Sequence, residues 1–180
     1  YKNYIIYEPK KRQISALPLK DRVIQHALVN IIEPGIDKTF IFDSHACRPG
    51  HGLKLAVDRF VKFSRHNKFC LKCDIKSYFA SIDHNILKNT YRRKIKCEKT
   101  LWLIDLIIDS TPGTGLPIGS LLSQLSANLY LHELDIFIKH SLKERHYIRY
   151  MDDFVIFGND KNDLLATKEK VRGFLSSTLK

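Results

Sequence analysis

The sequence predicts an α+β fold in which a small antiparallel sheet is backed by helices. Stretches with apolar side chains at helical spacing alternate along the chain with single strand-like runs. Near the C-terminus, two apolar runs flank a short turn and predict a tight hairpin. The 180 residues are 44% hydrophobic, as expected of a folded globular protein, and no apolar run approaches the roughly 18 residues that span a bilayer.

The first third of the chain is basic and interrupted by prolines, so we expect a separate lobe over residues 1–68. Two helices are predicted in this lobe, over residues 21–33 and 53–66, and Pro34-Gly35 is expected to stop the first. The expected apolar face of the first helix consists of Ile24, Ala27, Leu28 and Ile31. The residues at core spacing in the second are Ala56, Phe60 and Phe63.

The remaining part, residues 69–180, opens with the strand-like run "KFCLKCDI" and continues with helical patterns over about 84–110 and 120–144. In the strand, Phe69, Leu71 and Cys73 share one face, and Cys70, Lys72 and Asp74 share the other. "HYIRY" and "FVIFG" predict the hairpin. A capped amphipathic helix follows, and its expected inward residues are Leu164, Leu165, Val171 and Leu175.

The charge of the chain favours a polyanionic partner. Lys and Arg number 30 against 19 Asp and Glu, a net charge of +11, which points to nucleic acid before other partners. A basic surface kept for solubility is the alternative. The four cysteines are interpreted as reduced core thiols of an intracellular protein. Cys70 and Cys73 lie on opposite faces of a predicted strand, which disfavours joint metal binding.

Acidic residues stand at unusual places in the predicted strands. Asp152 and Asp153 lie side by side within an apolar run, and Asp74 ends the strand 78 positions earlier. If the two strands pair, their carboxylates come together and repel each other unless a cation lies between them. Mg²⁺ prefers carboxylate and water oxygens, and two such ions can stabilise an in-line phosphoryl displacement. Each aspartate could instead be an ordinary turn residue.

Five segments resemble a known family. "CDIKSYFASIDH", "GLPIGSLLSQLSANLYL" and "YIRYMDDFVIFG" occur in the order, and at about the spacing, of the central palm motifs of reverse transcriptases. "LPLKDRVIQHALVNIIEP" and "SHACRPGHG" resemble the fingers motifs of the bacterial group II intron-like branch. The resemblance implies a right-hand polymerase with fingers over 1–68, a partial palm over 69–180 and fingers helices inserted around 84–114. A thumb is not expected within this chain, which we interpret as a piece of a longer protein.

The resemblance also implies a catalytic centre. Asp74, Asp152 and Asp153 would bind two Mg²⁺ ions with help from the Ile75 carbonyl, and Mn²⁺ could replace Mg²⁺. Phe79 matches the family's steric gate, whose ring crowds a ribose 2′-OH and so favours dNTPs. The alternative for Phe79 is a core aromatic, although its neighbour Tyr78 could fill that role instead.

The same resemblance assigns nucleotide contacts. Arg48 resembles the fingers arginine that contacts the incoming triphosphate, and its alternative is a solvated loop residue. Gly119, Ser123 and Gln124 fall in the motif that supports the templating base and the nucleotide. Group II intron-like enzymes usually have Gln at the position of Ile118. The string Ile-Gly-x-x-x-Ser-Gln found here instead resembles diversity-generating retroelement polymerases. We therefore hypothesise low fidelity, with simple packing of Ile118 as the alternative. His84 is expected to cap the helix that follows it.

The leading interpretation is an RNA-directed DNA polymerase that adds dNTPs to a primer 3′-OH on an RNA template by two-Mg²⁺ catalysis. One alternative is a catalytically silent RNA-binding maturase or defence scaffold. Another is an RNA-directed RNA polymerase, which Phe79 disfavours. We expect a cytoplasmic bacterial protein, an RNA template, a DNA or RNA primer, no membrane, and room for an accessory protein. The chain alone is expected to be weakly active or inactive, and its oligomeric state stays open.

Overall fold

The computed structural model describes residues 2–7 and 12–179 of the chain. It has two compact units. The helical unit comprises residues 1–39 and 77–130, and the sheet unit comprises residues 40–76 and 131–180. Residues 1, 8–11 and 180, which belong to the predicted regions 1–68 and 69–180, lie outside the described residues. Within the described part, no helix is long and apolar enough to cross a membrane.

The sheet unit contains the small antiparallel sheet that the sequence predicts. Its strands are β3 (Phe69–Asp74), β4 (Tyr147–Tyr150) and β5 (Asp153–Gly158), and β5 lies in the middle. Backbone hydrogen bonds attach the segment around Ser44 to the free edge of β4. The Arg149 amide donates to the Asp43 carbonyl at 2.9 Å, and the His45 amide donates to the Arg149 carbonyl at 3.0 Å. This pairing covers one edge of the sheet.

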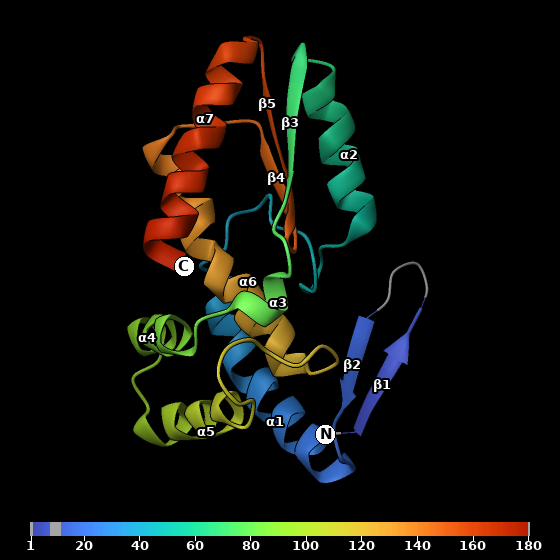
Figure 1. Ribbon diagram of the computed structural model, residues 1–180, viewed down its shortest axis with the longest axis vertical. Helices are drawn as coiled ribbons and strands as arrows, with labels where there is room; N and C mark the ends of the chain where they lie inside the picture. The colour runs from blue at the N-terminus through green and yellow to red at the C-terminus, as the bar shows by residue number, and fades with distance from the viewer. Residues whose placement is uncertain (1, 8–11, 180) are drawn as a thin grey trace. The chain divides into compact units, whose positions relative to one another are not determined.

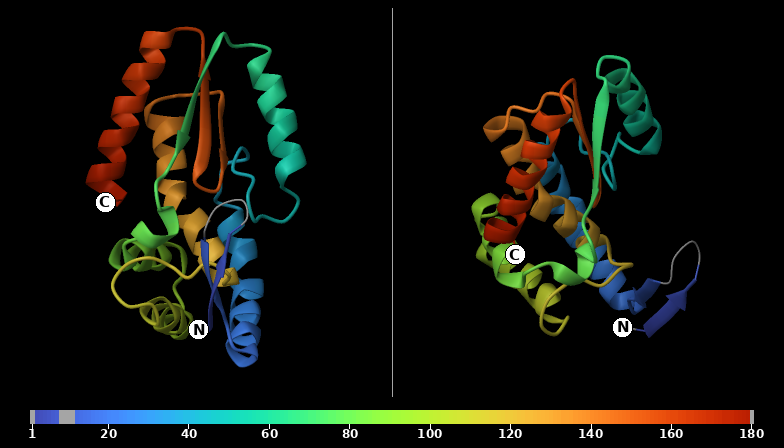
Figure 2. Two further views of the ribbon diagram at one scale, coloured as in Figure 1. Left: turned by 45° about the vertical axis from the view of Figure 1, so that its right-hand side comes forward. Right: turned by 45° about the horizontal axis from the view of Figure 1, so that its top comes forward.

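Helices α2 (Leu53–Ser64) and α7 (Lys161–Phe174) lie on opposite sides of this sheet (Figures 1 and 2). Side chains alternate between the two faces, as the period of a strand requires. Under α2, a core cluster joins Phe63 of the helix to Ile148 and Phe157 of the strands. On the other face, Gly158 lets α7 approach closely, because a Cβ there would lie 3.2 Å from two Leu164 side-chain carbons. Both helices are therefore fixed on the sheet by apolar contacts.

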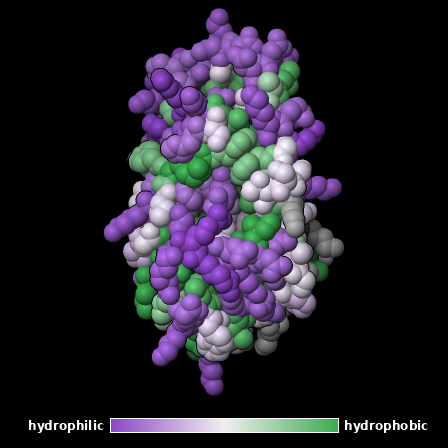
Figure 3. Space-filling model, turned by 90° about the vertical axis from the view of Figure 1, so that its left-hand side faces the viewer, coloured by the Kyte–Doolittle hydropathy of each residue, from purple (hydrophilic) through white to green (hydrophobic). Residues whose placement is uncertain are grey.

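The helical unit begins with a hairpin of β1 (Lys2–Ile6) and β2 (Arg12–Ala16). Its helices are α1 (Leu19–Asp37), α3 (Tyr78–Ser81), α4 (His84–Lys94), α5 (Glu98–Asp109) and the first part of α6 (Leu121–Ile136). In the sheet unit, α6 continues as a π-helical turn, Phe137–Ser141, and α7 ends in another, Leu175–Leu179. Ion pairs join Arg92 to Asp105 and Lys88 to Asp109 between α4 and α5. The face of the molecule that Figure 3 shows carries many hydrophilic side chains with hydrophobic ones among them.

Two expectations about α1 are wrong. The helix continues through Pro34 to Asp37, because a proline near the last turn removes only one backbone hydrogen bond while the extension buries Ile36, which is 2% exposed. The buried face is also rotated from the predicted one. Ile24 and Ile31 are exposed, and Leu28 is the only member of the predicted set that is buried. The observed buried residues are Gln25, Leu28, Val29, Ile32 and Ile36.

Other elements agree with the predictions more closely. The pattern over 84–110 forms two helices, and Leu164 and Val171 of α7 are buried as expected. Leu165 and Phe60 are instead 48% and 41% exposed, since each lies at the margin of its helix's buried face. Within the described residues the cysteines form no disulfide, and they are not the core residues that the sequence predicts. Cys47, Cys70 and Cys97 are exposed and Cys73 is half-buried.

Candidate active site

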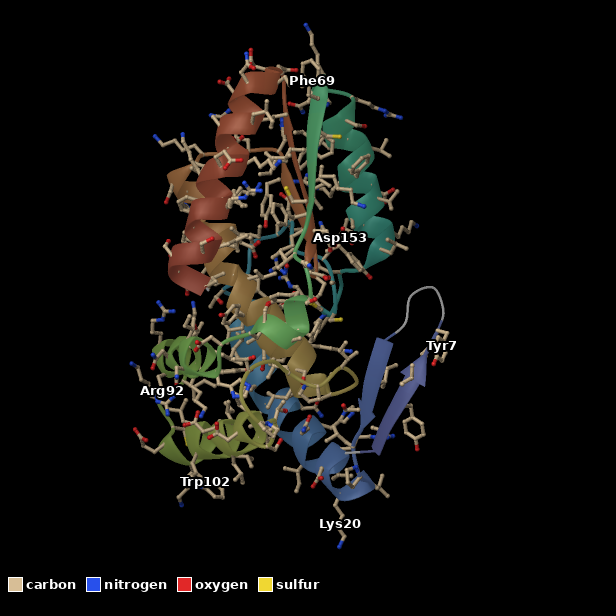
Figure 4. All side chains as sticks on the ribbon, viewed as in Figure 1. Tyr7, Lys20, Phe69, Arg92, Trp102 and Asp153 are labelled. Atoms are coloured by element: carbon tan, nitrogen blue, oxygen red, sulfur yellow. The ribbon has the colours of Figure 1, made fainter. Side chains whose placement is uncertain are left out.

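Strand pairing brings the predicted acidic residues together at one end of the sheet. Asp74 on β3 pairs in register with Asp153 on β5, so both side chains point from the same face. The Ile75 amide donates to the Asp152 carbonyl at 3.3 Å, which places the third aspartate beside the pair. Phe69 marks the far end of the β3–β5 pairing and Asp153 marks the acidic end (Figure 4). Asp74 and Asp153 are exposed to solvent and Asp152 is half-buried.

A basic side chain lies close to these carboxylates. Lys72 Nζ is 3.7 Å from Asp153 Oδ1, and the two side chains are 72% and 54% exposed. An ion pair this exposed contributes only about 0–1 kcal/mol, so it leaves the carboxylates accessible to a stronger cation. Carboxylate oxygens are ligands of the type that Mg²⁺ prefers. Over residues 2–7 and 12–179, no three His, Cys, Asp or Glu side chains converge closely enough to enclose a metal by themselves.

The hairpin tip between β4 and β5, which carries Asp152, has an unusual backbone conformation. Met151 adopts a positive φ of 57°, which non-glycine residues rarely do. The Arg149 guanidinium donates from Nη1 to the Met151 carbonyl at 3.0 Å and so stabilises this conformation. A side chain of β4 therefore stabilises the hairpin tip through this hydrogen bond.

Arg149 is also half of a buried ion pair that sequence reasoning missed. Its Nε and Nη2 donate to the two carboxylate oxygens of Asp135 on α6, both at 2.7 Å, and both side chains are fully buried. The Tyr147 hydroxyl donates to the same carboxylate at 2.7 Å, and burial, followed by the Asp135 charge, raises the pKa of Tyr147 well above its usual value. Asp135, an aspartate within the largely apolar helix α6, was the one sign in the sequence of a buried cationic partner.

The structure gives Arg48 two backbone partners within the sheet unit. Its Nη1 donates to the carbonyls of Ile41 at 2.8 Å and Ser44 at 2.5 Å, and its guanidinium lies 5.3 Å from the Phe40 ring centre. These contacts stabilise the loop that contains Arg48. Both bonds come from Nη1, which is one of the three nitrogens of the guanidinium.

The same loop contains a histidine pair. His45 Nδ1 and His51 Nδ1 are 3.1 Å apart, and His45 is fully buried. Burial, and then the neighbouring His51, lower the pKa of His45 to about 4. His45 Nε2 lies 4.0 Å from Asp43, whose carboxylate binds Arg59 at 2.6 and 3.0 Å. His45 is therefore neutral at physiological pH.

In the helical unit, Tyr78 and Phe79 have different environments. Tyr78 is 3% exposed, and its hydroxyl donates to the Ala127 carbonyl of α6 at 2.6 Å. Phe79 is half-buried, and its ring meets that of Tyr78 edge to face at 5.7 Å. Tyr78 is thus the core aromatic of the pair, which leaves the Phe79 ring available for a role at the surface.

The residues of the predicted nucleotide motif divide between two places in the helical unit. Gly119 and Gln124 line a hollow of about 360 Å³ together with Arg22 and His26 of α1, which sequence reasoning did not single out. Ser123 does not line this hollow, because it is 4% exposed and faces a small void between α5 and α6. The Ile118 carbonyl accepts from the Ser15 amide at 2.8 Å. The next residue, Gly119, has φ +114°, and a Cβ there would lie 3.1 Å from the Ser15 carbonyl oxygen, so a side chain at this position would be strained.

Comparisons with known proteins identify the family of the chain. The sequence profile of the family "Reverse transcriptase (RNA-dependent DNA polymerase)" matches residues 3–178. Protein YkfC of Escherichia coli is 26% identical over 97% of this chain, and the group II intron-encoded protein LtrA of Lactococcus lactis is 31% identical over 72% of it. The chain spans 59% of YkfC and 23% of LtrA.

Solved structures support the fold. Apo telomerase of Candida tropicalis, truncated from its C-terminal domain, matches 99% of this chain and 47% of that chain with a TM-score of 0.72 at 14% identity. Telomerase of the same organism with a fragment of telomeric RNA matches 94% of this chain and 37% of that chain, with a TM-score of 0.67 at 15% identity. The family profile covers nearly every residue, and so the chain belongs to the reverse transcriptase family, in its group II intron-like branch.

Proposed function

We propose that the chain carries the fingers and part of the palm of an RNA-directed DNA polymerase, which adds dNTPs to a primer 3′-OH along an RNA template. The observation that carries this proposal is the register pairing of Asp74 with Asp153, next to Asp152. Solvent-exposed carboxylates gathered from two strands repel one another, and this repulsion is relieved by binding cations. Membership of the reverse transcriptase family supports the same reading.

Each residue has a role in this proposal. The carboxylates of Asp74, Asp152 and Asp153, with the Ile75 carbonyl, would hold two Mg²⁺ ions. Bound Mg²⁺ supplies the positive charge that favours ionisation of the primer 3′-OH and stabilises the pyrophosphate that leaves. Phe79 excludes a ribose 2′-OH, Arg48 binds the triphosphate, and Gly119, Ser123 and Gln124 support the nucleotide and its templating base. Ile118 offers no polar contact there, so we propose low fidelity.

The test uses the natural protein that contains this chain, with an RNA template, an annealed DNA primer and Mg²⁺. Asp152→Asn should abolish dNTP incorporation and leave RNA binding unchanged, because it removes one negative charge and keeps the side-chain shape. Asp58→Asn removes an exposed carboxylate from α2 and serves as the matched control. If Asp152→Asn retained full incorporation, the proposal would be wrong, and a wild-type protein that binds RNA without incorporating nucleotides would favour a scaffold.

Two comparisons refine the proposal. Preference for dNTPs over NTPs is expected, and a preference for NTPs would favour the RNA polymerase alternative instead. A misincorporation assay tests fidelity, and equal error rates for the wild type and Ile118→Gln would argue against a role for Ile118.

A further inference from the structure

The segment that carries Phe79 is bound by a second segment of the helical unit. The Leu116 amide donates to the Phe79 carbonyl at 2.7 Å, and the Gly115 amide donates to the Ile82 carbonyl at 2.8 Å. Thr114 Oγ1 donates to the Ala80 carbonyl at 3.3 Å. Residues 114–116 therefore satisfy three carbonyl acceptors in and directly after α3, which at four residues is too short to be stable by itself.

His84 completes this arrangement from the other side. Its Nε2 lies 2.7 Å from the Gly115 carbonyl, and the side chain is 8% exposed. A carbonyl oxygen only accepts hydrogen bonds, so Nε2 carries the hydrogen. The expectation that His84 caps α4 is wrong, because Asp83 is the cap and accepts from the Ile86 amide at 3.0 Å. The imidazole is used instead to hold Gly115.

Gly115 is confined by backbone. Its φ is +88°, and a Cβ there would lie 2.8 Å from the Ala80 Cα and carbonyl oxygen and 2.9 Å from the Phe79 carbonyl oxygen. A flexible side chain could move away from such a Cβ, but these atoms belong to the main chain on either side of the Phe79–Ala80 peptide. Admitting a methyl group would require that peptide to retreat by roughly 0.6 Å, the difference between 2.8 Å and an ordinary 3.4 Å contact.

We propose that Gly115 and His84 are positioning residues for Phe79 and that they determine how strictly the protein selects the sugar of the incoming nucleotide. This inference rests on the proposed function, in which the Phe79 ring excludes the 2′-OH. Steric exclusion of one hydroxyl works only if the ring cannot recede. The Phe79 main chain is fixed by the Leu116 amide on one side and, through its neighbour Tyr78, by the Ala127 carbonyl on the other. Loss of the hydrogen bond from the Leu116 amide to the Phe79 carbonyl would let the Phe79 ring move away from a 2′-OH.

The experiment measures kcat/KM for dNTP and for rNTP in the natural protein that contains this chain. Gly115→Ala and His84→Ala should each lower the dNTP to rNTP ratio at least fivefold, while His84→Gln, which keeps an N–H donor, should restore much of it. Gly113→Ala is the matched control, because Gly113 lies in the same turn with φ +81° and nothing within 4 Å of a Cβ. It should stay within twofold of the wild type. A change below fivefold in both test variants overturns the inference.

The outcomes separate the inference from the proposed function. A wild-type protein that incorporates no dNTP rejects the proposed function, whereas incorporation with an unchanged ratio in the variants rejects only the positioning role. Simple destabilisation lowers both kcat/KM values equally and leaves their ratio unchanged. If Gly115→Ala is inactive, amide hydrogen exchange tests instead whether the substitution loosens the contact between residues 114–116 and the Phe79 segment. Faster exchange at the Leu116 amide, relative to Gly113→Ala, supports the inference, and unchanged protection of that amide contradicts it.

Discussion

Removing the charge of Asp135 should destabilise the sheet unit severely. Asp135→Asn keeps the shape of the side chain but leaves the Arg149 guanidinium buried without its counter-charge. The wild-type carboxylate accepts two bonds from Arg149 and one from Tyr147, all at 2.7 Å. Breaking a buried pair by removing one partner costs about 3–5 kcal/mol. This is a large part of the roughly 5–15 kcal/mol by which domains are stable.

Amide hydrogen exchange of β4 and β5 measures the loss of stability in the strands that Arg149 and Tyr147 belong to or adjoin. A loss of about 3–5 kcal/mol should accelerate exchange there by a factor on the order of 10² to nearly 10⁴. Glu169→Gln is the matched control, because the Arg172–Glu169 pair is 69% and 63% exposed and should cost no more than about 1 kcal/mol. If both variants changed exchange equally, the buried pair would not support the hairpin and the reasoning would fail.

Three further predictions concern the sheet unit. Lys72→Gln should lower the Mg²⁺ concentration needed for half-maximal dNTP incorporation by up to about fivefold, because the 3.7 Å Lys72–Asp153 pair competes with cations, and an unchanged or higher requirement would contradict this. Asp160→Ala should cost about 0.5–2 kcal/mol in urea unfolding, since its carboxylate accepts from the Asn162 and Asp163 amides at the start of α7, and an unchanged midpoint would refute the capping role. The pKa of His45 is about 4 in the folded chain, against 6.5 ordinarily. Between these pH values the unfolded state binds a proton that the folded state does not bind. The contribution of His45 to the free energy of unfolding should therefore be fully present above pH 6.5 and fall towards pH 4 by an amount on the order of 3 kcal/mol. His45→Phe should flatten this part of the stability profile, and an equally steep profile in that variant would assign the effect to other groups.

Much of the architecture was predictable from local patterns. The alternating faces of 69–74, the hairpin and the cap of the last helix follow from short-range spacing, because a strand or a helix end is defined by a few neighbouring residues. The gathering of Asp74 with Asp152 and Asp153 was predictable for a related reason. When the strand that ends at Asp74 pairs antiparallel with the strand that begins at Asp153, the two residues lie at the same end of the sheet.

Contacts between distant parts of the chain could not be predicted in this way. Which side of α1 is buried depends on what packs against it, and Gln25 is buried because Ser120, 95 positions away, donates to it at 2.5 Å. Likewise, only the folded chain brings Arg149 to Asp135 and His84 to Gly115. Local patterns predicted the strands of the three-stranded sheet, the acidic residues at their ends and the family, but they did not predict the hairpin of β1 and β2. Tertiary structure decided which polar side chains are buried, because a buried polar group needs a partner and that partner is supplied by packing.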